Sequence, residues 1–450
     1  MRSVHDRPTA ALGRFGRGAA VLACLAALAA AGCSREGSHR SAEDGARPSA
    51  VGAPSPHADV PDNPSASAST PPPSSAPVPD GDAFFDPPLP LPPVKPGDVI
   101  RQRPFDVPQA GFAGAAKQIL VMYATTGYDG KPVATTGLVF LPPGPAPAGG
   151  WPVAATDHGT LGSAPKCGPS RGTWAFLNND PDAGPGLVDT LLAQGFAVVQ
   201  PDYLGLGATG TPHAYLHAKS AAYSTLDLIR AARNLTPDIG KSTILTGNSQ
   251  GGHAALWSGH YAPEYAPELD VKGIIAEAPA VGFDAMPELV AQQSETSAPY
   301  IGIFLTLVRA ASLTDPNFKP EAFLTPAALA QVRFDPQECF GDTGPMPAPD
   351  DVLLPNADLG PIKAYLTANA TSQVKLRVPV LLTQGGRDIL SAMNNALAQD
   401  LCARGAAAIE FKPYPDGAHT LGASAVADDV AWIQARLAGT PVTGACTFEP

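Results

Sequence analysis

The sequence predicts an α/β fold in which helices flank a mostly parallel central sheet and a helical cap is inserted between two strands. From residue 151 onward, short apolar runs of strand length alternate with longer segments of helical periodicity. This alternation lapses between about residues 281 and 375, which is too long for a surface loop, so we expect the inserted cap there. The alternation then resumes and ends in an amphipathic helix.

The first expected strands form an antiparallel pair, because Asp129-Gly130, a strong hairpin signal, separates the apolar runs 117–123 and 133–141. The later strands are expected to be parallel, since helical segments connect them as in βαβ units. These strands are 153–156, 197–200, 242–246, 273–276, 378–383 and 408–412. The expected helices are 186–193, 221–234, 251–261, 300–311 within the cap, 389–401 and 424–437.

Residues 1–33 have the three-part plan of an export signal. Four arginines precede an apolar run from Ala19 to Ala31, and Cys33 follows two residues later. The run is shorter than the roughly 20 apolar residues that a membrane-spanning helix needs. Residues 30–33 resemble a bacterial lipobox, in which Cys33 becomes the lipid-bearing first residue of the mature protein. Ala stands where Leu is usual, which leaves simple secretion as the alternative, and Cys24 is a rival lipidation site.

Residues 34–96 are rich in Pro, Ser and Ala and predict a disordered linker, because such a segment cannot bury a core. At roughly 3 Å per residue, it could hold the expected catalytic domain, residues 97–450, on the order of 100 Å from a lipid anchor. We therefore expect an exported protein, either a cell-surface or periplasmic lipoprotein or a secreted protein. Its contact with a membrane would be through the N-terminal anchor alone.

Four cysteines remain after the signal segment, namely Cys167, Cys339, Cys402 and Cys446. An even set in an oxidising compartment predicts two disulfides. Of the three pairings that four cysteines allow, we favour Cys167 with Cys339 and Cys402 with Cys446, the second fastening the tail to the last region.

The charge of the chain limits its partners. Its formal net charge is −12 and no cluster of Lys and Arg stands out, so we do not expect nucleic-acid binding. The sequence gives no indication of the oligomeric state.

The segment Gly247-Asn248-Ser249-Gln250-Gly251 lies where an expected strand meets an expected helix. In this context a G-x-S-x-G segment is a nucleophile elbow, a sharp turn that exposes the serine hydroxyl. The turn leaves almost no room for neighbouring side chains, which explains Gly247 and Gly251. We therefore predict that Ser249 is a catalytic nucleophile.

A serine hydroxyl needs a base to remove its proton, so an acid and a histidine should follow Ser249 in the order Ser, Asp, His. Asp388 follows one expected strand and His419 follows the next, which would place both at the carboxyl edge of the sheet. We predict Asp388 as the acid and His419 as the general base. Glu277 and Asp416 are rival acids. Alternatively, Asp388 caps the following helix and His419 is an exposed loop residue.

Acyl transfer also needs donors for the oxyanion, normally the N–H after the nucleophile and another from the loop after an earlier strand. Gln250 supplies the first. His158-Gly159-Thr160 follows the expected strand 153–156 and should supply the second. We favour the Thr160 N–H, with its hydroxyl as a helper, and rank Gly159 next, whereas His158 is expected to be structural.

Several motifs together resemble one enzyme family, the bacterial secretory lipases, which are similar in layout to the fungal lipase A group. The resemblance covers roughly residues 96–448 and implies the α/β-hydrolase fold, with esterase or lipase activity on acylglycerols. It also implies a lid or cap, no metal and no organic cofactor. The motifs are His158-Gly159-Thr160, Cys167-Gly168-Pro169-Ser170, Pro201-Asp202-Tyr203-Leu204-Gly205-Leu206-Gly207 with His213 and Tyr215 after it, and Gly247-Asn248-Ser249-Gln250-Gly251-Gly252.

Two alternative functions stay open. A short-chain or polymer esterase without lipase action would share the catalytic residues, because acyl-chain preference lies in the cap. A surface-tethered binding protein could keep the fold without the chemistry. For either hydrolase the expected partner is a small-molecule or lipid ester.

Overall fold

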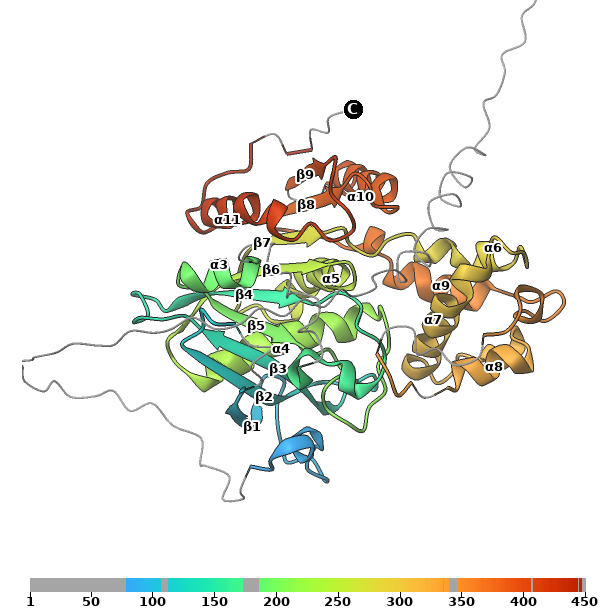
Figure 1. The fold of residues 1–450 in the computed structure, drawn as a ribbon, viewed down its shortest axis with the longest axis horizontal. Helices are drawn as coiled ribbons and strands as arrows, with labels where there is room; N and C mark the ends of the chain where they lie inside the picture. The colour runs from blue at the N-terminus through green and yellow to red at the C-terminus, as the bar shows by residue number, and fades with distance from the viewer. Residues whose placement is uncertain are drawn as a thin grey trace, which may run out of the picture.

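The computed structural model describes residues 78–106, 112–172, 186–334, 336–339, 346–405, 408–443 and 445–446. The expected signal segment, Cys24, Cys33 and the linker up to residue 77 lie outside the described residues. Within the described part, a nine-stranded sheet forms the centre and helices cover both of its faces (Figure 1).

The sheet is antiparallel at one edge and parallel elsewhere. Its strands lie in the order β1-β2-β3-β5-β4-β6-β7-β8-β9, and pairing is antiparallel from β1 to β5 and parallel from β5 to β9. In the sheet β5 lies before β4, which places β4 directly beside β6. The loops that follow β4 and β6 therefore meet at the carboxyl ends of these neighbouring strands. The strands are β1 (Val99–Pro104), β2 (Lys117–Thr126), β3 (Pro132–Leu141), β4 (Trp151–Asp157), β5 (Ala197–Pro201), β6 (Ile239–Asn248), β7 (Asp270–Glu277), β8 (Pro379–Gly385) and β9 (Ala408–Tyr414).

Two apolar cores lie on opposite faces of the sheet. Successive side chains of a strand point to opposite faces, so Val121 and Tyr123 of β2 join one core, while Leu120 and Met122 join the other. All residues of β5 are buried, as expected for a strand covered on both faces. Helices α4 (Ala218–Leu235), α5 (Gln250–Tyr265) and α10 (Ser391–Ala403) pack on the first core, and α3 (Leu187–Ala193) and α11 (Ala423–Leu437) pack on the second.

The helices between β7 and β8 form a third apolar cluster of their own. Figure 1 shows them as a group beside the sheet. Asn369 links this group to the main body: its backbone carbonyl accepts hydrogen bonds from His253 Nε2 (2.9 Å) and Trp257 Nε1 (3.1 Å). Its side-chain oxygen accepts from Ala218 N at 2.9 Å. The helices are α6 (Met286–Val290), α7 (Ile301–Thr314), α8 (Pro326–Val332) and α9 (Gly360–Asn369).

Both disulfides that we favoured are present. Cys167, which follows β4, is bonded to Cys339 in the segment between β7 and β8. Cys402 of α10 is bonded to Cys446 near the C-terminus. The first disulfide therefore connects the loop after β4 to the cap region.

The structure differs from the sequence expectation near the end of the linker. Gly81–Phe85 form a 3-10 helix, and Phe84 and Phe85 are buried. The Arg171 guanidinium lies 3.9 Å from the centre of the Phe85 ring. The burial of these two aromatic rings stabilises the packing of this segment on the domain. The Pro and Ser content of the segment does not predict this packing. The sequence also does not predict β1, because two of its six residues are arginines and none is fully buried.

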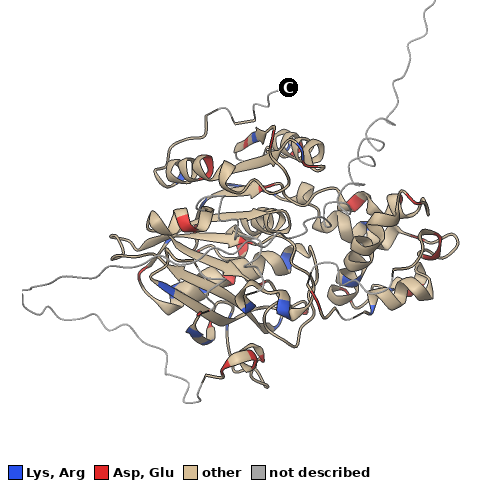
Figure 2. Cartoon of the chain, viewed as in Figure 1, with Lys and Arg blue, Asp and Glu red and all other residues tan. Residues whose placement is uncertain are grey.

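Charged residues are spread over the described part of the chain. In Figure 2, Lys and Arg lie on several elements with Asp and Glu among them. None of the helices in the described residues is both long enough and apolar enough to span a bilayer.

Candidate active site

Ser249 occupies the sharp turn between β6 and α5. Its φ of 57° and ψ of −115° are unfavourable for a residue with a side chain, which is the strain expected at a nucleophile elbow. Backbone hydrogen bonds hold this conformation: Ser249 N donates to Glu277 O at 2.9 Å, and Ser249 O accepts from Ala280 N at 3.0 Å. The loop after β7 therefore supports the elbow from one side.

The glycines of the elbow are required by close backbone contacts. A Cβ atom on Gly251 would lie 1.9 Å from Asp157 O, and one on Gly247 would lie 2.4 Å from Gly251 C. Asp157 ends β4, which is paired with β6 at Gly247, so the contact lies between two neighbouring strands and the helix that follows one of them. The structure thus gives a steric reason for both predicted glycines.

Asp388 and His419 are hydrogen-bonded, with Asp388 Oδ2 lying 2.9 Å from His419 Nδ1. The Asp388 side chain is 2% exposed and that of His419 is 34% exposed. Asp388 Oδ2 also accepts from Gln384 Nε2 at 2.8 Å, and Oδ1 accepts from Leu390 N at 3.1 Å. Because α10 begins at Ser391, Asp388 is not its N-cap.

The environment of Asp388 favours its ionised form. Burial by itself would raise the pKa of this carboxyl, but the hydrogen bonds from His419 and Gln384 lower it, and the pKa ends below its ordinary value. A carboxylate at this position accepts a hydrogen bond from His419 Nδ1–H, which leaves Nε2 free to act as a base.

The loops that carry Asp388 and His419 are joined along their backbones. Gly386 N donates to Tyr414 O at 2.7 Å, and Arg387 N donates to Gly417 O at 2.9 Å. A Cβ atom on Gly385 would lie 2.0 Å from Ala418 O, so this close approach requires glycine. The sequence pattern Gly-Gly-Arg-Asp thus reflects the packing of one loop against the other.

The rival acids have other positions. Glu277 Oε1 accepts hydrogen bonds from Asn248 Nδ2 and Leu421 N, each at 2.9 Å. Asp416 is exposed. The imidazole of His419 is thus paired with Asp388, and Glu277 binds the two segments on either side of it.

A side chain next to Ser249 holds the His419 loop at the elbow. Asn248 Nδ2 donates to His419 O at 3.1 Å, across 171 positions of sequence. The structure therefore brings the Asp388–His419 pair to the turn that carries Ser249.

The loop after β4 lies on the other side of Ser249. A Cβ atom on Gly159 would be 3.9 Å from Ser249 Cβ. Thr160 Oγ1 is hydrogen-bonded to the Tyr215 hydroxyl at 2.8 Å. His158 is buried, and burial lowers its pKa to about 4, so this ring is neutral and structural, as expected. Gln250 is the first residue of α5, where a backbone N–H has no partner within the helix.

Sequence reasoning missed the residues that support this loop. The sequence places Tyr215 in a motif but indicates no contact for its side chain. His213 accepts a hydrogen bond at Nε2 from Gln250 Nε2 (3.2 Å), while its Nδ1 donates to Leu204 O (2.9 Å). Burial lowers the pKa of His213 to about 4, so the ring stays neutral and can accept in this way. Only the fold brings these residues to the elbow, and the motif that contains His213 and Tyr215 does not indicate their contacts.

Comparison with known proteins shows which enzymes the chain is similar to. A family model described as secretory lipase matches residues 183–342, which include the elbow and part of the cap region. Lipase A of Arthroderma benhamiae is 26% identical over 397 residues, a match that covers 81% of each chain. The chain is thus similar to secretory lipases.

A solved structure shows the same fold. The crystal structure of Candida antarctica lipase A in its closed state has a TM-score of 0.63 and 23% identity, and the match covers 79% of this chain and 86% of that chain. The fold is thus the α/β-hydrolase fold, and the lipase relatives make the protein a carboxylic ester hydrolase. A Mycobacterium tuberculosis protein described as a probable inactive lipase is 31% identical over 210 residues, 44% of this chain and 45% of that one.

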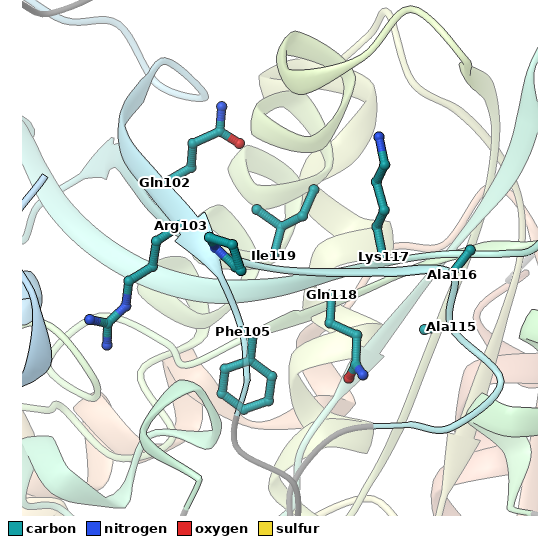
Figure 3. A pocket seen from close by; sticks show the side chains of 9 residues that line it. Gln102, Arg103, Phe105, Ala115, Ala116, Lys117, Gln118 and Ile119 are labelled. Atoms are coloured by element: carbon teal, nitrogen blue, oxygen red, sulfur yellow. The ribbon is translucent and has the colours of Figure 1, made fainter.

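A surface hollow of about 630 Å³ lies at the antiparallel side of the sheet, between β1 and β2. In Figure 3, Lys117 and Ile119 point to one side of the strand, whereas Phe105 and Gln118 point to the other. These side chains do not converge on one point, and four strands lie between β1 and β6 in the sheet. We assign the hollow no part in ester hydrolysis.

Metal ligands do not gather in the described part of the chain. There, no group of three or more His, Cys, Asp or Glu side chains is arranged to hold an ion.

Proposed function

We propose that the protein is an exported serine esterase that hydrolyses carboxylic esters, acylglycerols among them, through an acyl-enzyme on Ser249. The observation that carries this proposal is the hydrogen-bonded Asp388–His419 pair, held beside the strained turn of Ser249 by Asn248. An acid, a base and a hydroxyl in this arrangement are the parts that nucleophilic catalysis needs.

The reaction begins when His419 Nε2 takes the proton of the Ser249 hydroxyl as its oxygen attacks the ester carbonyl. Asp388 holds the Nδ1 proton and stabilises the imidazolium that forms. The N–H groups of Gln250 and Thr160 stabilise the oxyanion of the tetrahedral intermediate. His419 then protonates the departing alcohol, and a water molecule activated by the same ring releases the acid and regenerates Ser249.

A fluorophosphonate probe tests this proposal directly. Such a probe should label the wild-type protein, and Ser249→Ala should abolish both labelling and ester hydrolysis. The hydrolysis rate should also rise from acidic to neutral pH as His419 loses its proton. A folded wild-type protein that neither reacts with the probe nor cleaves esters would favour the alternative, a binding protein without catalysis. One relative is described as a probable inactive lipase, which is the observation behind this alternative.

The substrate class is a separate part of the proposal. Relatives described as lipases support acylglycerols, whereas a neighbouring solved structure is described as a rice cell wall degrading esterase from Xanthomonas oryzae. Hydrolysis rates for 4-nitrophenyl esters of increasing acyl length, and for an emulsified triacylglycerol, would separate a lipase from a short-chain or polymer esterase. Activity confined to short esters would reject the acylglycerol assignment.

Export with lipid attachment is proposed from the N-terminal sequence. The two disulfides support an oxidising compartment. Lipidation at Cys33 predicts a membrane-associated protein that Cys33→Ser converts to a soluble one. Wild-type protein recovered only in the soluble fraction, with an unmodified N-terminal peptide in mass spectrometry, would favour secretion.

A further inference from the structure

Glu277 is the last residue of β7, directly beside the end of β6 in the parallel sheet, and its Cα is paired with that of Asn248. Its backbone carbonyl accepts the hydrogen bond from Ser249 N at 2.9 Å. Its side chain points to the loop that carries His419, where Glu277 Oε1 accepts from Leu421 N at 2.9 Å. Glu277 therefore contacts both the elbow and the loop between β9 and α11 that carries His419, which we call the base loop.

Asn248 completes this connection. Its side-chain nitrogen donates to Glu277 Oε1 at 2.9 Å and to His419 O at 3.1 Å. The base loop is thus held at two points, by Asn248 at the backbone of His419 itself and by Glu277 at position 421. Without these bonds, the loop between β9 and α11 would depend on its own chain and on the Asp388 loop.

The charges around Glu277 give its carboxylate a second role. The titratable groups that interact with it are His419 of the base loop, Tyr414 at the end of β9 and Asp429 of α11. Burial raises the pKa of Glu277 to about 7, although the hydrogen bonds from Leu421 and Asn248 and a protonated His419 oppose this shift. A negative charge here is therefore most favourable when His419 is positively charged.

We infer that Glu277 is a positioning residue, whose carboxylate holds the His419 loop against the elbow and stabilises the imidazolium that forms during proton transfer. This inference rests on the proposed function, because it assigns Glu277 a part in the same reaction. Glu277 does not touch the substrate carbonyl or the Ser249 hydroxyl in this role. Its effect is exerted through the position and charge of His419.

The test compares Glu277→Gln with the wild type. The amide keeps the size of the side chain but removes its charge, and hydrogen bonds to charged groups are stronger than neutral ones. We expect kcat to fall about ten- to a hundredfold with KM nearly unchanged. The acid limb of the kcat/KM profile should move to lower pH, because His419 loses its proton more readily when the nearby negative charge is absent.

Two further variants distinguish a loss of activity caused by the missing carboxylate from one caused by misfolding. Asn248→Ala removes the link between Glu277 and His419 O and should also lower kcat with little change in KM. Glu410→Gln is the matched control: Glu410 lies on β9 and accepts a hydrogen bond from Trp432 Nε1, away from Ser249. It should retain wild-type kcat and the wild-type pH profile.

The outcomes separate this inference from the proposed function. If Ser249→Ala retains activity, the proposed function itself is wrong. If Ser249→Ala is inactive and folded Glu277→Gln keeps both kcat and the position of its acid limb, the role of Glu277 is wrong and the mechanism stands. If Glu277→Gln does not fold, Asn248→Ala decides, and unchanged kcat in that variant would reject the inference.

Discussion

His419 Nδ1 lies 2.9 Å from Asp388 Oδ2, although 31 positions separate the two residues in the sequence. Two consecutive parallel strands, β8 and β9, end at the same edge of the sheet, and each is followed by one of these residues. The hydrogen bond to Asp388 keeps a proton on His419 Nδ1, so that Nε2 is the nitrogen that can accept a proton. Substitution of Asp388 tests this role.

Asp388→Asn should reduce kcat/KM by about 10⁴-fold if the pair acts as it does in serine hydrolases of other folds. The asparagine amide can donate to Nδ1, which favours the tautomer with a proton on Nε2, and that tautomer cannot accept the Ser249 proton. Steady-state kinetics with a soluble ester would measure the loss. Asp416→Asn is the matched control, because Asp416 is exposed in the same loop as His419, and it should keep full activity. Loss of activity in the control alone would identify Asp416 as the acid.

Tyr215→Phe should lower kcat about fivefold with little effect on KM. The Tyr215 hydroxyl is hydrogen-bonded to Thr160 Oγ1, and burial raises the pKa of Tyr215, so the hydroxyl keeps its proton at neutral pH. Loss of one such bond corresponds to about 1 kcal/mol and would loosen the loop that supplies the second oxyanion donor. The control is Tyr123→Phe, which removes a buried hydroxyl that is bonded to Ser224 O and not to Thr160. An equal loss of kcat in both variants would show that only stability is affected.

Removal of the Cys167–Cys339 disulfide by substituting both cysteines with alanine should lower the free energy of unfolding by about 2–5 kcal/mol. Removal of Cys402–Cys446 should cost about 1 kcal/mol less on chain-entropy grounds, because it closes 44 positions and the first closes 172. Only the first disulfide connects the loop after β4 to the cap region, so only its removal should also reduce kcat. Denaturant unfolding and ester hydrolysis, measured on both double variants, would check this, and equal effects on kcat would contradict it.

Asp157→Asn should become more stable relative to the wild type as the pH rises from 5 to 8. Burial raises the pKa of Asp157 to about 8, and among the described residues its Oδ2 has no hydrogen-bond partner. An unfolded aspartate has a pKa of about 3.9, so the folded state holds an extra proton between these values. The wild-type free energy of unfolding therefore falls as the pH rises through this window, and asparagine removes this dependence.

The expected gain is on the order of a few kcal/mol at pH 8. Urea unfolding at pH 5, 6.5 and 8 would measure it. Asp350→Asn, a substitution at an exposed position, should follow the wild-type curve throughout. A constant difference between Asp157→Asn and wild type at all three pH values would show that Asp157 is ionised in the folded protein.

Much of the fold can be predicted from local patterns. The expected strands and helices agree with β2 to β9 and with α3, α4, α5, α7, α10 and α11 to within a few residues. Apolar periodicity reflects which side chains of a single helix or strand are buried, so it can be recognised in the sequence alone. It fails for β1, where two arginines interrupt the apolar pattern, and for Phe84 and Phe85, which lie in a segment with linker composition.

The candidate site divides in a similar way. The elbow could be predicted because strand, turn and helix are adjacent in the sequence, and its glycines meet backbone atoms that any such turn must approach. The choice between Asp388 and Glu277 could not be settled in this way. Both follow strands that end at the same sheet edge, and only the direction of the side chains separates them.

The sequence by itself predicted the kind of chemistry, a serine on a strained turn followed by an acid and a histidine, because the strand, turn and glycines that mark each of these residues lie within a few positions of it. The tertiary structure alone decided which carboxylate meets the imidazole, that Asn248 and Glu277 hold the His419 loop, and that Tyr215 reaches Thr160. Those contacts join residues 31 to 171 positions apart. Their geometry follows from the order of the strands and the packing of loops, which no local pattern of residues encodes.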